Sequence, residues 1–99
     1  MTEKEKCKEG LFYNPNKDEE LIKERNDCKV LCQEYNNIYY LDLEKRNELI
    51  KKILKKTQNI FQIEPPFWCD YGYNTEIGEN FYSNHNLVIL DCAKVIFGN

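Results

Sequence analysis

The fold is decided by residues 74–97, which read NTEIGENFYSNHNLVILDCAKVIF. Asparagine recurs at every sixth position in the first part of this stretch, at Asn74, Asn80 and Asn86. A second series with the same spacing consists of Ile77, Ser83, Ile89 and Val95. A flat strand repeats with period two and a helix with a period of about 3.6, so a period of six indicates neither.

A parallel β-helix built from hexapeptide repeats explains this period. Each short strand forms one side of a triangular coil. Each corner takes Gly or Asn, because these residues tolerate left-handed backbone angles at low cost. The inward position on each side must be apolar or small, since three sides converge on one axis. A meander of short strands is the alternative that could mimic the same spacing.

The first half of the chain has the hydrophobic period of helices. Asn16 and Glu19 resemble a capping pair that opens a helix, and Asn36-Asn37 is a stop signal. Between them, apolar residues recur at helical spacing: Leu21, Cys28, Leu31, Cys32 and Tyr35.

A second helix is expected to begin after Asp42, which is placed to cap it. Its apolar stripe consists of Leu43, Ile50, Ile53 and Leu54. Its last turns are expected to contain a cluster of cations that suits the negative end of the helix dipole, namely Lys51, Lys52, Lys55 and Lys56. We therefore predict an α+β fold, with a helical hairpin over residues 1–57 and solenoid coils over 58–99, where Pro65-Pro66 forbids a helix.

Composition bounds the function. A chain of 99 residues that is 41% hydrophobic is sized for one folded domain. The net charge of −3 gives no support to nucleic-acid binding. No apolar run approaches the roughly 18 residues that a membrane span needs. The opening Met1-Thr2-Glu3-Lys4-Glu5-Lys6 lacks the apolar stretch of a signal peptide, so a cytoplasmic location is expected.

The chain has an odd number of cysteines: Cys7, Cys28, Cys32, Cys69 and Cys92. In a reducing compartment they are interpreted as free thiols that behave as small hydrophobes. Cys28 and Cys32 share one helix face, but nothing spaces His85 against the cysteines, so no metal site is expected. His85 also has no evident orienting partner, and we interpret it as an ordinary surface residue rather than as half of a Cys–His pair.

The residues from Glu64 onward are similar to a known family. The segments that match are Glu64-Pro65-Pro66-Phe67, Cys69-Asp70-Tyr71-Gly72-Tyr73-Asn74, Ile77-Gly78, Asn80-Phe81, Asn84, Asn86 and Ile89-Leu90-Asp91. The opening matches less specifically, at Glu3-Lys4-Glu5-Lys6, Gly10, Tyr13-Asn14 and Tyr35-Asn36. Together they resemble the maltose and galactoside O-acetyltransferases of the hexapeptide-repeat superfamily, over nearly the whole chain.

The resemblance implies a fold and an activity. Members pack an N-terminal helical segment on a left-handed parallel β-helix, and three chains assemble with active sites between neighbouring subunits. They transfer an acetyl group from acetyl-CoA, the co-substrate, to a sugar hydroxyl. A histidine acts as the general base, because a hydroxyl is a poor nucleophile until a group within hydrogen-bonding reach takes its proton.

The resemblance also implies acceptor-site residues. Asp70 and Asn84 match positions that contact the sugar, and Tyr82 and Asp91 lie beside that pocket. Asn14 falls near a sugar-binding position of the N-terminal segment, where the alignment is loose. The alternative for these polar residues is structural, since they could satisfy the backbone at solenoid corners.

The chain departs from the family pattern after Ile89-Leu90-Asp91. The family's catalytic histidine and its CoA-binding coils follow that segment, whereas this sequence ends at Gly98-Asn99. His85 is not at the position of that base. We therefore expect a truncated solenoid that self-associates or is only marginally stable, binds no acetyl-CoA by itself and is inactive alone. It is either the N-terminal part of a sugar O-acetyltransferase or a non-catalytic sugar-binding or assembly module.

Overall fold

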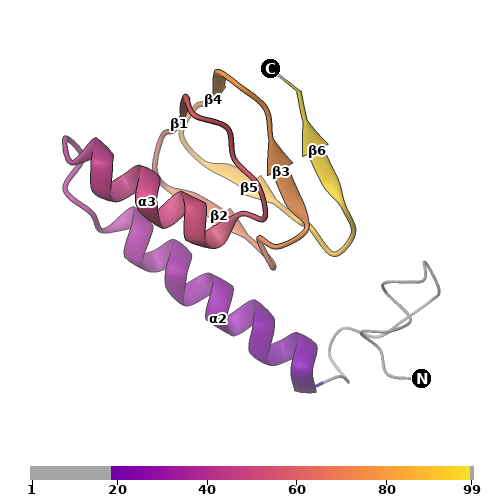
Figure 1. Ribbon diagram of the computed structural model, residues 1–99. Helices are drawn as coiled ribbons and strands as arrows, with labels where there is room; N and C mark the ends of the chain where they lie inside the picture. The colour runs from indigo at the N-terminus through magenta and orange to yellow at the C-terminus, as the bar shows by residue number, and fades with distance from the viewer. Residues whose placement is uncertain (1–18, 99) are drawn as a thin grey trace.

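The computed structural model of the chain describes residues 19–98. Within them, two helices come first and six three-residue strands follow (Figure 1). The elements are α2 (Glu19–Asn36), α3 (Leu43–Ile53), β1 (Phe61–Ile63), β2 (Phe67–Cys69), β3 (Thr75–Ile77), β4 (Phe81–Ser83), β5 (Leu87–Ile89) and β6 (Val95–Phe97). The expected capping residue Asn16 lies outside the described residues.

Helix α2 has the buried face that its sequence predicts. Its buried side chains are Leu21, Cys28, Cys32 and Tyr35. The helix ends at Asn36, the first residue of the predicted stop signal. Neither α2 nor α3 has the length and hydrophobicity that a membrane-spanning helix needs.

Helix α3 begins where predicted, with Asp42 as its N-cap accepting a hydrogen bond from the backbone N–H of Lys45 at 3.2 Å. Its buried face differs in one place from the prediction. Leu43 is 47% exposed, whereas Arg46 is buried. The reason is position, because Leu43 adjoins the exposed loop before the helix, while Arg46, nearly one turn later, faces β1 and donates to the carbonyl of Ile63.

The helix also ends earlier than the lysine cluster suggested. Leu54 is its C-cap and has an extended backbone, with φ −88° and ψ 148°. Lys55 and Lys56 therefore lie beyond α3, contrary to the prediction. Lys56 instead pairs with Glu76 in an isolated parallel bridge, which leads the chain into the strands.

The strands form two stacked circuits of the chain. Each strand pairs in parallel with the strand three places later, giving the two-stranded sheets β1–β4, β2–β5 and β3–β6. In every pair the partner lies twenty residues further on, as in Phe61↔Phe81, Phe67↔Leu87 and Thr75↔Val95. This pairing excludes the meander, in which consecutive strands would be hydrogen-bonded to each other.

The predicted period of six holds from one strand to the next, except at the corner that follows the second strand of each circuit. Ile77, Ser83 and Ile89 are the third residues of consecutive strands, but Val95 is the first residue of β6. The cause is a corner two residues longer than the others, because β6 begins eight residues after the start of β5.

The corner asparagines behave as predicted at two of three positions. Asn80 and Asn86 have left-handed φ values of 61° and 69°. Asn74 does not, because Gly72, with φ 82°, takes the left-handed conformation at the longer corner. The peptide bond between Pro65 and Pro66 is cis.

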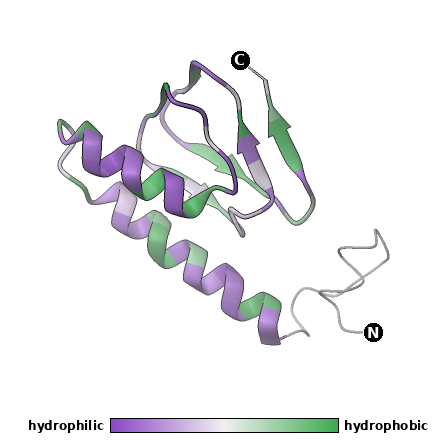
Figure 2. Cartoon of the chain, in the orientation of Figure 1, coloured by the Kyte–Doolittle hydropathy of each residue, from purple (hydrophilic) through white to green (hydrophobic). Residues whose placement is uncertain are grey.

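The core lies between the helices and the first circuit. The first and third residues of β1, β2 and β3 are all buried. Helix α2 covers some of them, since Tyr35 packs edge-on against Phe67 and Cys28 contacts Cys69. The corresponding residues of β4, β5 and β6 are only half-buried, apart from Ile89. Figure 2 shows hydrophobic residues concentrated in these strands and hydrophilic residues along much of the helices.

Candidate functional site

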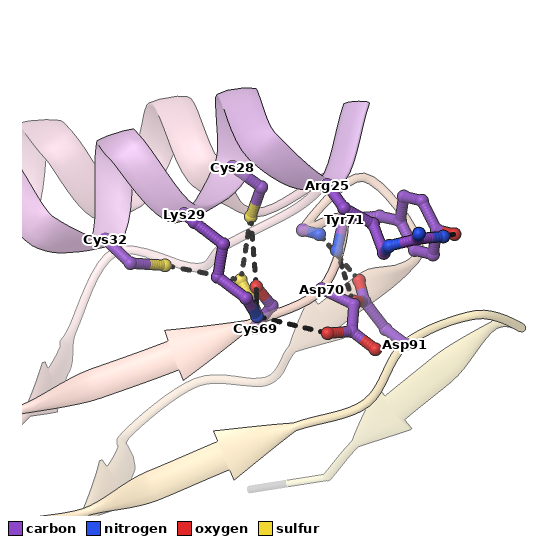
Figure 3. A network of polar contacts seen from close by, with 9 residues as sticks. Arg25, Cys28, Lys29, Cys32, Cys69, Asp70, Tyr71 and Asp91 are labelled. Carbon is purple, nitrogen blue, oxygen red and sulfur yellow. Dashed lines mark hydrogen bonds and ion pairs between the residues drawn. The ribbon is translucent and has the colours of Figure 1, made fainter. Parts of the chain in front are cut away.

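Asp70 lies at the corner that follows β2 and faces helix α2 (Figure 3). Its Oδ1 accepts a hydrogen bond from Lys29 Nζ at 3.1 Å, and the same ammonium donates to the carbonyl of Cys69 at 3.0 Å. The side chain of Asp70 is a quarter exposed. Its carboxylate is thus oriented by a cation and still open to solvent, a state in which it can accept a hydrogen bond from a ligand hydroxyl.

Asp91 lies at the equivalent corner of the second circuit and is fully buried. One carboxylate oxygen accepts from the backbone N–H of Tyr71 at 2.8 Å. The other accepts from the N–H of Gly72 at 2.8 Å and from Thr75 Oγ1 at 3.0 Å. Figure 3 shows this carboxylate beneath the loop that carries Tyr71. Both oxygens are engaged within the chain, so in this structure Asp91 organises the longer corner.

Asn84 and Tyr82 lie at a different corner, before β5. Tyr82 is the exposed middle residue of β4, and Asn84 follows that strand with its Oδ1 accepting from the backbone N–H of His85 at 3.0 Å. Both side chains are exposed. Asn14, the remaining residue expected at the acceptor site, lies outside the described residues.

The expected acceptor residues therefore do not converge within one chain. Asp70 pairs beyond the end of β5, with its N–H donating to Ile89, while Asn84 precedes the start of that strand. The strand between them, β5, alone spans about 10 Å, and a turn at residues 85–86 precedes it. Spacing along the sequence could not show this, because it depends on which end of a coil side each residue occupies.

A second polar group surrounds Glu64, at the corner after β1. Its Oε2 accepts from the Tyr40 hydroxyl at 2.5 Å, and its Oε1 accepts from the Gln62 side-chain amide. The Nε2 of His85 lies 3.9 Å from Oε2, and the Nδ1 contacts the carbonyl of Pro65. The hydrogen bond from Tyr40, with further support from Gln62 and the positive charge of Arg46, holds the pKa of Glu64 below its ordinary value.

His85 thus lies at the corner between β4 and β5 and contacts Pro65 and Glu64, which lie at the corner between β1 and β2. The contact between Glu64 and Tyr40 was not predicted from the sequence. The signal for Glu64 was its place at the head of the matching segment, but nothing in the sequence links it to Tyr40, which lies 24 positions earlier.

Three buried cysteines form the third cluster. Cys28 and Cys32 come from one face of α2, and Cys69 ends β2. The Sγ atom of Cys69 lies 3.3 Å from that of Cys28 and 3.8 Å from that of Cys32. Hydrogen bonds that the Cys69 thiol donates to Cys28 and Cys32, together with burial, raise the pKa of Cys69. The i, i+4 spacing predicted the first pair, whereas the approach of Cys69 depends on the packing of α2 on β2.

Comparisons with known proteins agree with this architecture. Residues 6–58 match the family described as the maltose acetyltransferase hexapeptide capping motif. A putative acetyltransferase of Saccharomyces cerevisiae is 48% identical over 87 residues, which cover 88% of this chain and 44% of that protein.

Two solved structures agree with the fold over the whole chain. A maltose O-acetyltransferase from Clostridium difficile 630 superposes with a TM-score of 0.92 at 40% identity, covering 100% of this chain and 52% of that one. A galactoside acetyltransferase in complex with coenzyme A superposes with a TM-score of 0.90 at 35% identity, covering 99% of this chain and 48% of that one.

The chain spans about half the length of the curated relatives that it matches. The family match extends over more than half of the chain, and the structural matches extend over nearly all of it. The two helices, the stacked parallel strands and these matches place the chain in the maltose acetyltransferase family of hexapeptide-repeat acetyltransferases.

Proposed function

We propose that the chain is the N-terminal part of a sugar O-acetyltransferase. The enzyme transfers the acetyl group of acetyl-CoA to a sugar hydroxyl, forming an ester C–O bond and breaking the thioester C–S bond. The observation that carries this proposal is the superposition of the whole chain on a maltose O-acetyltransferase, with the same helices and stacked strands. In this proposal residues 1–57 form the helical segment, and residues 58–99 form the first coils of a left-handed parallel β-helix.

The burial pattern supports a solenoid that extends further. The inward residues of the first circuit are buried beneath the helices, whereas those of the second circuit are half-buried on the side away from them. Phe81 and Phe97 lie on that open side, with ring centroids 5.3 Å apart. A further coil, in the same polypeptide or supplied by a second one, would cover these rings and remove their contact with water.

The acceptor site in this proposal is shared between neighbouring chains of a trimer. Asp70 accepts hydrogen bonds from sugar hydroxyls, and Asn84 both donates and accepts. Because the two lie at opposite ends of one coil side, a single sugar would contact Asp70 of one chain and Asn84 of the next. Tyr82, Asp91 and Asn14 are placed beside the same acceptor, with Asp91 acting through the corner that it organises.

The general base and the binding site for acetyl-CoA are proposed to lie in coils that follow the described ones. His85 is not assigned as the base, because its ring contacts the Pro65 carbonyl and faces Glu64. The chain by itself is then expected to bind the sugar weakly and to transfer no acetyl group.

A transfer assay tests the proposal. Release of CoA from acetyl-CoA is measured with maltose, glucose or a galactoside, for the chain alone and for a fusion to the second half of the Clostridium difficile enzyme. We expect activity only in the fusion. Asp70→Asn or Asn84→Ala should lower its kcat/KM by about 10- to 100-fold, the cost of one hydrogen bond to a charged or buried polar group.

The controls are changes of the same chemistry at exposed sites, Asp27→Asn and Asn59→Ala, which should leave the rate unchanged. Transfer by the chain alone would contradict the placement of the base. An inactive fusion that folds would contradict the proposed function.

A non-catalytic assembly module is the second candidate. It is favoured by exposed apolar side chains on the outer faces of the second circuit, Tyr82, Val88 and Ile96. The coding DNA downstream of Asn99 discriminates the two. Further hexapeptide repeats with a His-Pro pair would support the enzyme, and unrelated sequence would support the module.

A further inference from the structure

The three thiols of Cys28, Cys32 and Cys69 meet in the interior where α2 packs on the end of β2. All three residues are at most 4% exposed, and their Sγ atoms lie within 4.8 Å of one another. Figure 3 shows the three side chains directed toward one point between the helix and the strand. Cys69 lies 41 positions after Cys28 and 37 positions after Cys32, so tertiary packing brings the three sulfurs together.

The spacing of the sulfurs is that of a metal-bound set. A thiolate binds a metal ion such as zinc at about 2.3 Å, so three thiolates on one ion lie about 3.8 to 4.0 Å apart. The Cys32–Cys69 separation of 3.8 Å agrees with this, and the Cys28–Cys69 separation of 3.3 Å is shorter by about 0.5 to 0.7 Å. A small rotation about χ1 of Cys28 and Cys69, within their present rotamers, would open the shorter distance without moving the backbone.

The donor set selects the kind of ion. Among residues 19–98, no His, Asp, Glu or further Cys joins the three sulfurs to complete a tetrahedron. A structural zinc site needs four protein ligands, and a catalytic zinc site needs an open position for water, which these buried sulfurs do not offer. Monovalent copper is soft, prefers thiolate ligands and is satisfied by three of them.

Charge at the edge of the cluster also favours thiolates. Lys29 follows Cys28 in α2, and its Nζ lies 3.0 Å from the carbonyl oxygen of Cys69. Three thiolates and one Cu(I) carry a net charge of −2, and this ammonium, which also pairs with Asp70 at 3.1 Å, offsets a part of it. Binding releases the thiol protons to solvent, as metal binding to cysteine requires.

We propose that Cys28, Cys32 and Cys69 form a buried three-sulfur site for monovalent copper, which joins helix α2 to the first coil. The site adjoins Asp70, which is assigned to the sugar, because Lys29 contacts both the Cys69 carbonyl and the Asp70 carboxylate. Its loading would fix the helical segment on the solenoid and would raise the stability of the chain by mass action.

The test is a Cu(I) titration of the full chain under anaerobic, reducing conditions, in competition with bathocuproine disulfonate. The Cys7→Ser/Cys92→Ser double variant, which keeps only the three clustered cysteines, is the reference. We expect it to bind one equivalent of copper, as the unaltered chain does at this site. A further Cys69→Ser change should weaken binding by at least about 100-fold, since loss of even a supporting partner costs 10- to 100-fold.

A second measurement needs no variant and does not depend on one folding. The unaltered chain is alkylated with iodoacetamide, with and without Cu(I), and the modified positions are identified by mass spectrometry. Copper should slow modification of Cys28, Cys32 and Cys69 and leave the exposed Cys92 reactive.

Three results would overturn the proposal. They are equal copper affinity in the Cys69→Ser variant with a native circular dichroism spectrum, uniform protection of all cysteines, and one equivalent of Zn(II) bound in preference to Cu(I).

Discussion

Gly72 adopts a φ of 82° at the corner between β2 and β3, and a Cβ placed there would lie 2.1 Å from the carbonyl oxygen of Ile53. The atom in its way is backbone at the end of α3, so a rotamer change cannot relieve the clash. Gly72→Ala should therefore lower the free energy of unfolding by about 2 kcal/mol or more, from the left-handed strain and the displaced helix end. Urea denaturation followed by circular dichroism measures the change.

The matched control is Gly98→Ala, where a Cβ meets nothing within 4 Å. It should alter the free energy of unfolding by no more than about 0.5 kcal/mol. Equal effects of the two substitutions would show that the corner relaxes around a side chain.

Glu64 makes a pH-dependent contribution to stability. The hydrogen bond from Tyr40, followed by the contacts from Gln62, Arg46 and His85, lowers the folded-state pKa from its ordinary 4.5. As pH falls, the unfolded chain binds this proton first. The contribution is therefore complete above the ordinary pKa and is lost as pH falls through the folded-state pKa.

The measurement compares unfolding of the native chain and of Glu64→Gln between pH 3 and pH 7. The difference in stability between the two should be constant above about pH 5.5 and shrink below about pH 4.5. The control is Glu34→Gln, the same change of chemistry at an exposed position of α2. A difference for Glu64→Gln that is flat with pH would contradict the assigned hydrogen bonds.

For single residues, the sequence predicts the backbone conformation where the residue type alone decides it. Asn80 and Asn86 take left-handed angles, as expected of residues that tolerate them at a corner. Asn74 does not, because Asp91 from the second circuit binds the N–H groups of Tyr71 and Gly72 and sets the path of that corner. The contact joins residues some twenty positions apart, and local propensity contains no information about it.

At the scale of elements, Arg46 connects α3 to strand β1. Its guanidinium donates to the carbonyls of Tyr40 at 2.9 Å and Ile63 at 3.0 Å. It also lies over the ring of Tyr40, 4.8 Å from its centroid. Arg46→Ala would leave both carbonyls without this donor and open space beside Tyr35, so we expect a loss of about 2 to 4 kcal/mol.

Thermal and urea unfolding of Arg46→Ala and Arg46→Lys test this role. Lysine retains the charge but cannot reproduce the planar fork, so its loss should be intermediate. Lys51→Ala, an exposed change on the same helix, is the control and should be nearly neutral. A neutral Arg46→Ala variant would mean that apolar packing alone holds α3 in place.

The helices show that hydrophobic spacing predicts the position of an element better than it predicts which side chains that element buries. Apolar spacing located both helices, and Asn36 and Asp42 marked an end and a start that the structure confirms. The buried arginine could not be predicted, since its burial depends on two carbonyls and an aromatic ring supplied by other segments. The residues proposed to bind the acceptor present the same difficulty, because the path of the chain rather than sequence spacing separates Asp70 from Asn84.

For the whole molecule, the outer face of the second circuit predicts self-association. Val88 in β5 is 55% exposed, and Leu90, which points to the same side of the chain, is 68% exposed. An apolar pair of this kind beside half-buried strands favours contact with a second copy, which for a trimer triples the mass of 11.9 kDa. Light scattering after gel filtration, over a range of concentrations, measures the mass.

Val88→Lys should shift the population toward the monomer, because assembly would bury the introduced charge at the interface. The matched control is Val30→Lys, which adds the same charge at a valine of α2 that is 61% exposed. It should leave the mass unchanged. If Val30→Lys dissociates the assembly and Val88→Lys does not, the contact lies on the helix instead. A single monomer peak at every concentration, with cooperative unfolding, would rule out self-association through either face, and the shared acceptor site would then need a different source for its second half.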